Sequence, residues 1–266
     1  MVNELKTLVV VEGARLEPRF FEQLKKVFGL NLDIHCLKYN IYLLYKKMKD
    51  MGFNANLKDI LLEVNDTEET RALLKENFAF TYLIFDFDPH HTEEYEKDLP
   101  IETVVANNIA KVKEMAEYFV DETDPTIGRL YINYPMMEAF KDCDSFCDKN
   151  YLTRTVTLNQ IKCYKAIVGG RKMGSKRLDG YSREDFTQLI CQNVRKLGVI
   201  SGFSSSAMRY ADYIESSKQC NVLNCEVGFI KSLKQIAVLN TSVFFALDYY
   251  GNKEGFFDAT MENKTT

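Results

Sequence analysis

Short apolar runs alternate with amphipathic stretches along the first 150 residues of the chain. The apolar runs are rich in β-branched and aromatic residues and are bounded by polar or glycine-containing segments, which is typical of strands buried on both faces. Four such runs lie at residues 5–14, 32–39, 80–87 and 128–135. The pattern predicts a sheet whose strands are covered on both sides.

The stretches between these runs have the spacing of amphipathic helices. Residues 17–29 carry apolar side chains at helical intervals from Phe20 to Val27, and Gly29 provides a stop signal. Further helices are predicted at 41–51, 57–64, 68–78, 102–119 and 136–141. Because strands alternate with helices, we expect an α/β fold with a mostly parallel sheet and helices on both faces.

The character of the chain changes near residue 150. Residues 164–185 are rich in glycine and basic residues and are interpreted as a loop, while 182–197, 207–217 and 222–234 are predicted to be helical. We therefore expect two domains, an α/β core over residues 1–150 and a mainly helical region with a basic loop over residues 151–266.

Composition restricts the class of protein. The chain has 266 residues, 46% of them hydrophobic and 27% charged, with a net charge of -4. This is typical of a globular protein, and any contact with nucleic acid must use a local basic patch.

Location is predicted from what the chain lacks. The first seven residues show no secretory signal, and the longest apolar stretch, 236–250, is too short to span a bilayer and contains Asp248. We expect a cytoplasmic protein without membrane contact. Its seven cysteines then fit reduced thiols, and their spacing does not match paired zinc knuckles.

Acidic residues stand where two of the apolar runs end. Glu12 follows the first run, and Asp86 and Asp88 follow the third. Side chains two positions apart on a strand point to the same face, and open parallel sheets bind ligands at the carboxyl ends of their strands. If the two strands are neighbours, three carboxylates meet at one edge. Oxygen ligands of this kind favour Mg²⁺ or Mn²⁺, and Gly13 lets the backbone turn behind Glu12.

The segments "VVVEGARLEPRFF" and "LIFDFDPHH" together resemble the Toprim domain, whose signature is a glutamate after the first strand and a later Asp-x-Asp. The sequences of these two segments are most similar to those of the RloB-like and OLD-like (overcoming lysogenization defect) Toprim proteins of bacterial defence. Their opening motif is matched by Glu12, Gly13, Glu17 and Phe21, although Leu16 stands where threonine is usual.

A later Asn-Pro-x-x-Glu element of the same proteins resembles "INYPMMEAF", with Asn133, Pro135 and Glu138 and an additional Tyr134 between Asn and Pro. The resemblance extends over residues 5–140. It implies a Toprim-like, Rossmann-related core in which Glu12, Asp86 and Asp88 bind Mg²⁺ or Mn²⁺. It also implies catalytic roles for these three residues and for Glu17 and Glu138.

The function implied by the resemblance is that of a metal-dependent nuclease that hydrolyses phosphodiesters of DNA or RNA. Such defence nucleases act with an ATPase or sensor partner, which the residues themselves do not show. The alternative class is a non-catalytic Toprim-like binding or regulatory module, in which the acids only stabilise the fold or hold a ligand.

Each candidate acid also has a structural interpretation. Asp86 and Asp88 can cap a turn before Pro89, because aspartate favours such positions. Glu12, Glu17 and Glu138 each stand near a predicted helix start, where an acid interacts favourably with the helix dipole.

The basic loop has two interpretations as well. Its glycines resemble a phosphate-binding loop, but the order Ser175-Lys176 is the reverse of the Lys-Ser/Thr order that this motif requires. We expect the loop to contact a phosphodiester backbone instead, or to be a solvated surface. The candidate phosphate-binding residues are Lys165, Arg171, Lys172, Lys176 and Arg177.

Overall fold

The chain forms two compact units in the computed structural model, which describes residues 6–53, 56–65, 67–119, 128–146, 148–203, 208–251 and 255–262. Unit 1 comprises Met1–Lys25 and Gly29–Tyr131, and unit 2 comprises Lys26–Phe28 and Ile132–Thr266. The division falls inside strand β4 (Arg129–Asn133), which is earlier than the expected domain boundary after residue 150.

Unit 1 is built on a four-stranded sheet with the strand order β2-β1-β3-β4. Strand β1 (Lys6–Val11) pairs in parallel with β2 (Leu32–Cys36) and with β3 (Phe78–Asp86). The chain therefore leaves β1 for β2 on one side and later returns to β3 on the other side. The α/β class with a parallel sheet, predicted from the sequence, is confirmed.

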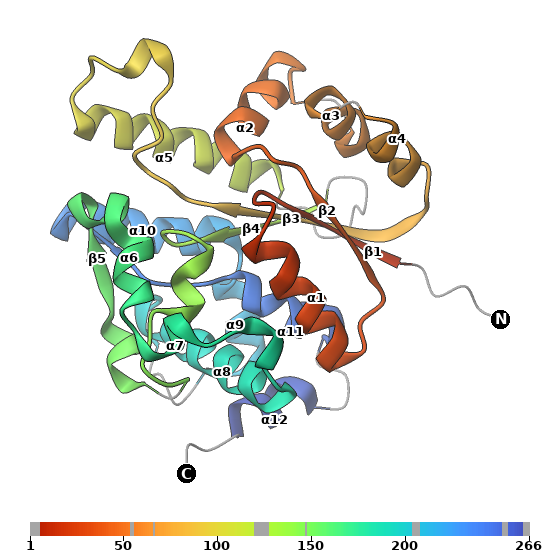
Figure 1. Ribbon diagram of the computed structural model, residues 1–266. Helices are drawn as coiled ribbons and strands as arrows, with labels where there is room; N and C mark the ends of the chain where they lie inside the picture. The colour runs from red at the N-terminus through yellow and green to blue at the C-terminus, as the bar shows by residue number, and fades with distance from the viewer. Residues whose placement is uncertain are drawn as a thin grey trace. The chain divides into compact units, whose positions relative to one another are not determined.

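Helices cover both faces of this sheet. Helix α1 (Leu16–Phe28) lies on one face and α2 (Ile41–Asp50), α3 (Leu57–Val64), α4 (Glu68–Leu74) and α5 (Ile101–Tyr118) lie on the other, as Figure 1 shows. The covering explains why β1 is apolar at consecutive positions: its residues Leu8 to Val11 are all buried. The expected helices between the strands are confirmed, although the helix expected over 68–78 ends at Leu74. The segment expected to be helical over 136–141 forms a 3-10 helix over Met137–Lys141.

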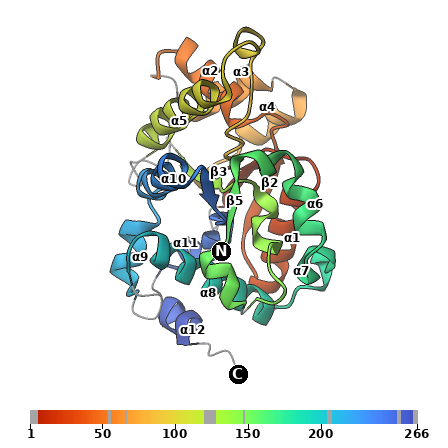
Figure 2. The same cartoon turned by 90° about the vertical axis from the view of Figure 1, so that its left-hand side faces the viewer.

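Unit 2 is mainly helical around a two-stranded antiparallel sheet. Strand β5 (Thr155–Thr157), drawn in green in Figure 2, pairs with β6 (Gln235–Ala237), drawn in blue. The helices of this unit are α6 (Tyr164–Gly169), α7 (Lys172–Ser175), α8 (Arg183–Ile200), α9 (Tyr210–Ser216), α10 (Gln219–Leu233), α11 (Phe245–Tyr250) and α12 (Phe256–Glu262). The predicted helices of this region are confirmed, but the segment predicted as a basic loop is largely helical.

Short 3-10 helices connect the larger elements. They are η1 (Glu94–Glu96), η2 (Met137–Lys141), η3 (Lys149–Thr153), η4 (Leu158–Cys163), η5 (Leu178–Gly180) and η6 (Ser242–Phe244). Within the described ranges, none of the helices combines the length and apolar character that crossing a membrane requires.

Buried polar side chains join distant parts of unit 2. Asn133 accepts hydrogen bonds from the backbone N–H and the hydroxyl of Ser242, at 3.2 and 2.9 Å. The Thr241 hydroxyl donates to the carbonyl of Ile132 at 2.8 Å. These buried contacts fix the residues after β6 against the end of β4, because a buried polar group that loses its partner is costly.

Glu226 on α10 is a fully buried acid of unit 2. Its Oε2 accepts a hydrogen bond from the backbone N–H of Ala237 at 2.9 Å, and burial raises its pKa to about 8. At pH values between the ordinary pKa of a glutamate and this raised pKa, Glu226 is protonated in the folded state and ionised in the unfolded state. Stability therefore decreases as pH rises through this window.

We expect Glu226→Gln to remove this part of the pH dependence. From pH 5.5 to 7, the wild-type free energy of unfolding should fall by roughly 2 kcal/mol through this group, since one proton corresponds to about 1.4 kcal/mol per pH unit. Urea denaturation at both pH values measures the difference. Glu102→Gln, an exchange at an exposed acid, should keep the wild-type pH dependence, and a Glu226→Gln variant that also kept it would contradict the assignment.

Candidate functional site

The carboxyl ends of β1 and β3 bring Glu12 and Asp86 together in unit 1. The two strands are neighbours in parallel, with Val11 in register with Ile84, as the sequence argument required. The Glu12 backbone N–H continues the pairing onto the carbonyl of Ile84 at 3.2 Å. The Glu12 carboxylate then accepts a hydrogen bond from the backbone N–H of Asp86 at 3.1 Å.

This position is the topological switch point of the sheet. The chain moves from β1 to β2 on one side and to β3 on the other, so connections leave the two central strands in opposite directions. In open α/β sheets, the crevice that results at the carboxyl ends of such strands is the usual ligand site. Glu12 follows β1 and Asp86 ends β3, so the two residues lie on the two strands that flank the switch point.

Glu17 belongs to the same edge and explains why residue 13 is a glycine. Glu17 is in the first turn of α1 and only 8% exposed. A Cβ at Gly13 would lie 2.5 Å from each carboxylate oxygen of Glu17. The backbone at Gly13 is outside the left-handed region, so the glycine is required for close approach and not, as the sequence suggested, for a sharp turn.

We expect Gly13→Ala to destabilise unit 1 by about 1–3 kcal/mol, because the added methyl group displaces a buried carboxylate. The same substitution in a Glu17→Ala background should cost much less, since the opposing oxygens are gone. Urea denaturation of the wild type, both single variants and the double variant measures the coupling between the two positions. Additive effects of the two substitutions would show that Glu17 does not limit the space at Gly13.

Asp88 stands outside the strand that ends at Asp86. Strand β3 ends at Asp86, and the exposed Asp88 begins a turn in which its carbonyl accepts from the N–H of His91 at 3.1 Å. Pro89 at the second position favours this turn and cannot continue a strand's hydrogen bonding. The expectation that strand geometry aligns both aspartates therefore does not extend to Asp88.

The turn from Asp88 to His91 is held by helices α2 and α5. The Tyr42 hydroxyl on α2 donates to the carbonyls of Phe87 and, at 3.0 Å, of Asp88. The buried Asn108 amide on α5 donates to the carbonyls of Pro89 and His91 at 2.9 and 2.7 Å. The His91 ring also stacks on Tyr42, with centroids 4.7 Å apart. These contacts fix the backbone that carries Asp88.

The acids of this edge fit a sparsely coordinated cation better than a closed metal site. In the part of the chain that the structure describes, no three His, Cys, Asp or Glu side chains are arranged to hold a metal ion. Glu12 and Asp86 nevertheless lie at adjacent strand ends, and Mg²⁺ often takes only one or two carboxylates and keeps several waters. The metal-ligand assignment of Glu12, Asp86 and Asp88 remains a prediction.

The segment "INYPMMEAF", which resembles the Asn-Pro-x-x-Glu element of Toprim proteins, lies in unit 2. Glu138, on η2, forms an ion pair with Lys165 at 3.1 Å. Asn133 is fully buried, and its amide oxygen is used by Ser242. In this structure Asn133 is a packing residue of unit 2, and Glu138 is a partly covered acid whose catalytic role remains a prediction.

Four of the five candidate phosphate-binding residues have carboxylate partners. Lys165 contacts Glu138, Arg171 contacts Asp142 at 3.0 Å, Lys176 contacts Asp185 at 2.7 Å and Arg177 contacts Asp179 at 2.9 Å. The fifth residue, Lys172, is exposed on α7. To contact a phosphate backbone, Lys165, Lys176 and Arg177 would have to exchange or share these carboxylates, which lowers the expected gain in affinity. Arg171 contacts Asp142 through Nε and keeps Nη1 and Nη2 for another acceptor.

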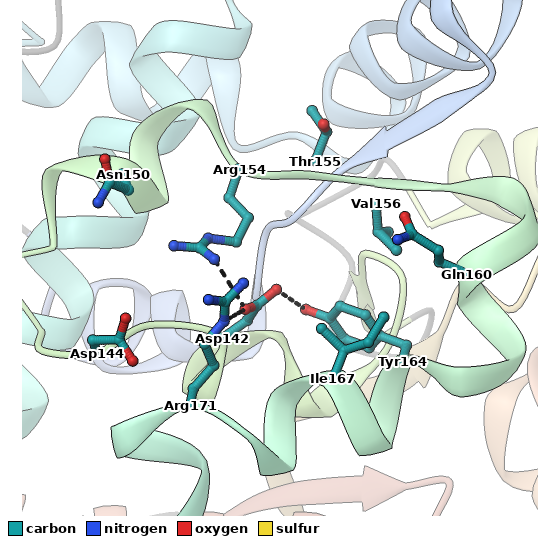
Figure 3. Close-up of a pocket in the computed structure, with 10 residues that line it drawn as sticks. All are labelled: Asp142, Asp144, Asn150, Arg154, Thr155, Val156, Gln160, Tyr164, Ile167 and Arg171. Atoms are coloured by element: carbon teal, nitrogen blue, oxygen red, sulfur yellow. Dashed lines mark hydrogen bonds and ion pairs between the residues drawn. The ribbon is translucent and has the colours of Figure 1, made fainter.

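A second site, which the sequence did not indicate, surrounds Asp142 in unit 2. A pocket of about 390 Å³ opens beside this residue, and Figure 3 shows the side chains that line it. Asp142 is 2% exposed and accepts hydrogen bonds from Arg171 and from the hydroxyl of Tyr164, at 3.0 and 3.1 Å. Burial raises the pKa of Tyr164 well above its ordinary value, so its hydroxyl remains a donor.

Comparison of the chain with models of known protein families, with curated proteins and with solved structures finds no match. The assignment of function therefore depends on the geometry of the two sites and on the motif resemblance.

Proposed function

We propose that the chain is a metal-dependent phosphodiesterase, a Toprim-like nuclease whose site lies at the carboxyl ends of β1 and β3. The observation that carries the proposal is the hydrogen bond from the Asp86 backbone N–H to the Glu12 carboxylate across the switch point, at 3.1 Å. Motif residues 74 positions apart along the chain are thereby neighbours at the edge where open sheets bind ligands.

Glu12 and Asp86 would hold the cation, and Asp88 would approach it from the fixed turn. When bound, Mg²⁺ or Mn²⁺ would neutralise charge on the phosphate and lower the pKa of a water molecule. The protein's own contribution is position. The Glu12 carboxylate ties the ends of the strands together, and Tyr42 and Asn108 hold the backbone that leads to Asp88. A prearranged site of this kind avoids reorganisation when the substrate arrives.

The proposed substrate is DNA or RNA. Lys172, exposed on α7, and Arg177, whose side chain is 81% exposed, are the members of the basic set best placed to meet a phosphate backbone. The motif resemblance adds an ATPase or sensor protein as a proposed partner and a role in bacterial defence in the cytoplasm.

One observation favours a different function, that of a non-catalytic binding or regulatory module. An oxygen of Glu12 is already used by the Asp86 backbone N–H, and the described residues hold no group of three metal-binding side chains. In such a module Glu12 would fix the edge of the sheet, and the crevice would hold a ligand without cleaving it.

An experiment that measures both metal binding and nucleic-acid cleavage distinguishes these two functions. Mn²⁺ binding would be measured by calorimetry, and cleavage of plasmid DNA, single-stranded DNA and RNA would be followed in Mg²⁺, Mn²⁺, Ca²⁺ and EDTA. We expect cleavage in Mg²⁺ or Mn²⁺ and none in EDTA. Metal binding without cleavage of any of these substrates would support the binding module, and full cleavage in EDTA would contradict the metal-dependent mechanism.

A further inference from the structure

We propose that the pocket beside Asp142 in unit 2 binds a small molecule that carries a terminal oxyanion, either a phosphomonoester or a carboxylate. The lining side chains all belong to unit 2, so the proposal does not depend on the nuclease assignment. The volume, about 390 Å³, lies within the range of pockets that bind small ligands.

The pocket is built around one buried acceptor and two arginines. Arg154 precedes β5, and Arg171 stands between α6 and α7. Figure 3 shows both side chains directed toward Asp142, from the two sides of the pocket. Arg171 donates from Nε at 3.0 Å, and Arg154 approaches with Nη1 at 3.6 Å. One carboxylate therefore orients two guanidinium groups within the same cavity.

The two arginines differ in how many donors remain for a ligand. Arg154 is only 13% exposed and places Nη2 on Asp148 at 3.2 Å, so both of its terminal nitrogens have carboxylate partners. Arg171 is 32% exposed and uses Nε alone in the contacts found among the described residues. Its Nη1 and Nη2 form the edge of the guanidinium that binds carboxylates and phosphates with two parallel hydrogen bonds.

Asp142 holds the Arg171 guanidinium, and with it the Nη1 and Nη2 donors, in one orientation. A free arginine loses side-chain entropy when it binds an anion, but Arg171 is already oriented through Nε. Asp142 is in turn held by the buried Tyr164 hydroxyl at 3.1 Å. The donors are thus positioned before the ligand arrives, which favours binding of an oxyanion over a loose surface contact.

The remaining residues that line the pocket indicate the chemistry of the part of the ligand beyond its oxyanion. Asn150 and Gln160 supply amide groups, while Val156 and Ile167 supply apolar surface. Asp144 adds an exposed carboxylate at the wall, where it accepts from the backbone N–H of Lys172 at 3.1 Å. A body with hydroxyl or amino groups would match this lining, whereas a chain of several phosphates would meet repulsion from Asp144.

The test is calorimetric titration of the full chain with four probes: adenosine monophosphate, glucose 6-phosphate, glutamate and inorganic phosphate. We expect saturable binding of at least one organic probe. Preference for the first two would identify a phosphomonoester, and preference for glutamate would identify a carboxylate.

Variants then locate the binding. Arg171→Gln should weaken it by about tenfold or more, because two charge-assisted hydrogen bonds are lost. Ile167→Trp should block the pocket while leaving the arginines intact, so it tests the proposal even if Arg171→Gln fails to fold. Arg209→Gln is the matched control, since this exposed arginine pairs with Asp212 and does not line the pocket.

Absence of saturable binding for all four probes would overturn the proposal. So would binding that survives both pocket variants. A blocked-end oligonucleotide is the fifth titrant, and if it alone responded to Arg171→Gln, the residue would contact nucleic acid and the small-molecule site would be excluded.

Discussion

Replacement of Asp86 by asparagine is expected to lower metal-dependent phosphodiester cleavage by two to three orders of magnitude, while the protein remains folded. The charged carboxylate at the switch point is lost, and removal of one preorganised electrostatic group of this kind typically costs 10²–10³-fold in rate. The fold should survive because Glu12 is held by the backbone N–H of Asp86, which asparagine retains.

Cleavage rates in Mg²⁺ and Mn²⁺ would be measured together with Mn²⁺ affinity for the wild type and for Asp86→Asn. Asp98→Asn, an exchange of the same kind at an exposed position beyond η1, provides the matched control and should keep wild-type activity. Equal rates for Asp86→Asn and the wild type would exclude Asp86 from the site. A parallel loss in both variants would indicate a general effect of charge.

Replacement of Asp142 by alanine should reduce the free energy of unfolding by about 3–5 kcal/mol, since it removes the acceptor from a buried set of charges. Arg154 would keep its contact with Asp148 but lose Asp142, and Arg171 and the Tyr164 hydroxyl would lose this acceptor. The main cost is that the partly buried guanidinium of Arg171 and the buried hydroxyl of Tyr164 lose this acceptor.

Urea denaturation measures this loss, and Asp144→Ala is its control. Asp144 is an exposed acid two residues away whose carboxylate accepts from the backbone N–H of Lys172, so its removal should cost about 1 kcal/mol. If the two variants lost the same stability, the carboxylate of Asp142 would not be the centre of the charge cluster. Asp142→Asn, which keeps an acceptor oxygen, should fall between them.

Unit 1 is the part of the fold that the sequence predicts best. Its strands are buried on both faces, so continuous apolar runs such as Leu8 to Val11 identify them directly. The parallel order also has a local cause, because a helix must cross the sheet between successive strands. From this, the proximity of Glu12 and Asp86 follows once β1 and β3 are neighbours.

Asp88 lies beyond the end of β3, so the alternation of side chains along a strand does not predict its position. The apolar run extends to Phe87, which is fully buried, but β3 ends one residue earlier. The turn at Pro89 and the Tyr42 contact then determine the backbone. Tertiary contacts of this kind are not encoded in the spacing of the two aspartates.

The glycines of the segment around α6 and α7 predict a loop. Gly174 instead allows close packing, since a Cβ there would collide with the backbone carbonyl of Val168. The sequence does not indicate the Asp142 pocket for a related reason. Its arginines lie 12 and 29 residues from Asp142 along the chain, and no local pattern indicates that they converge. Such pairs become visible only when the packing is known.

The buried bonds between the end of β4 and the segment after β6 also bear on how the chain folds. Asn133 and Ser242, like Ile132 and Thr241, are 109 residues apart, whereas the parallel strands of unit 1 are joined through shorter crossovers. Contacts of such high sequence separation raise the contact order, and their loop-closure entropy is lost before they contribute stability. During synthesis, unit 1 emerges with all its strands, but unit 2 must wait for residues near 240. We therefore expect the buried contacts of unit 2 to form later than the sheet of unit 1.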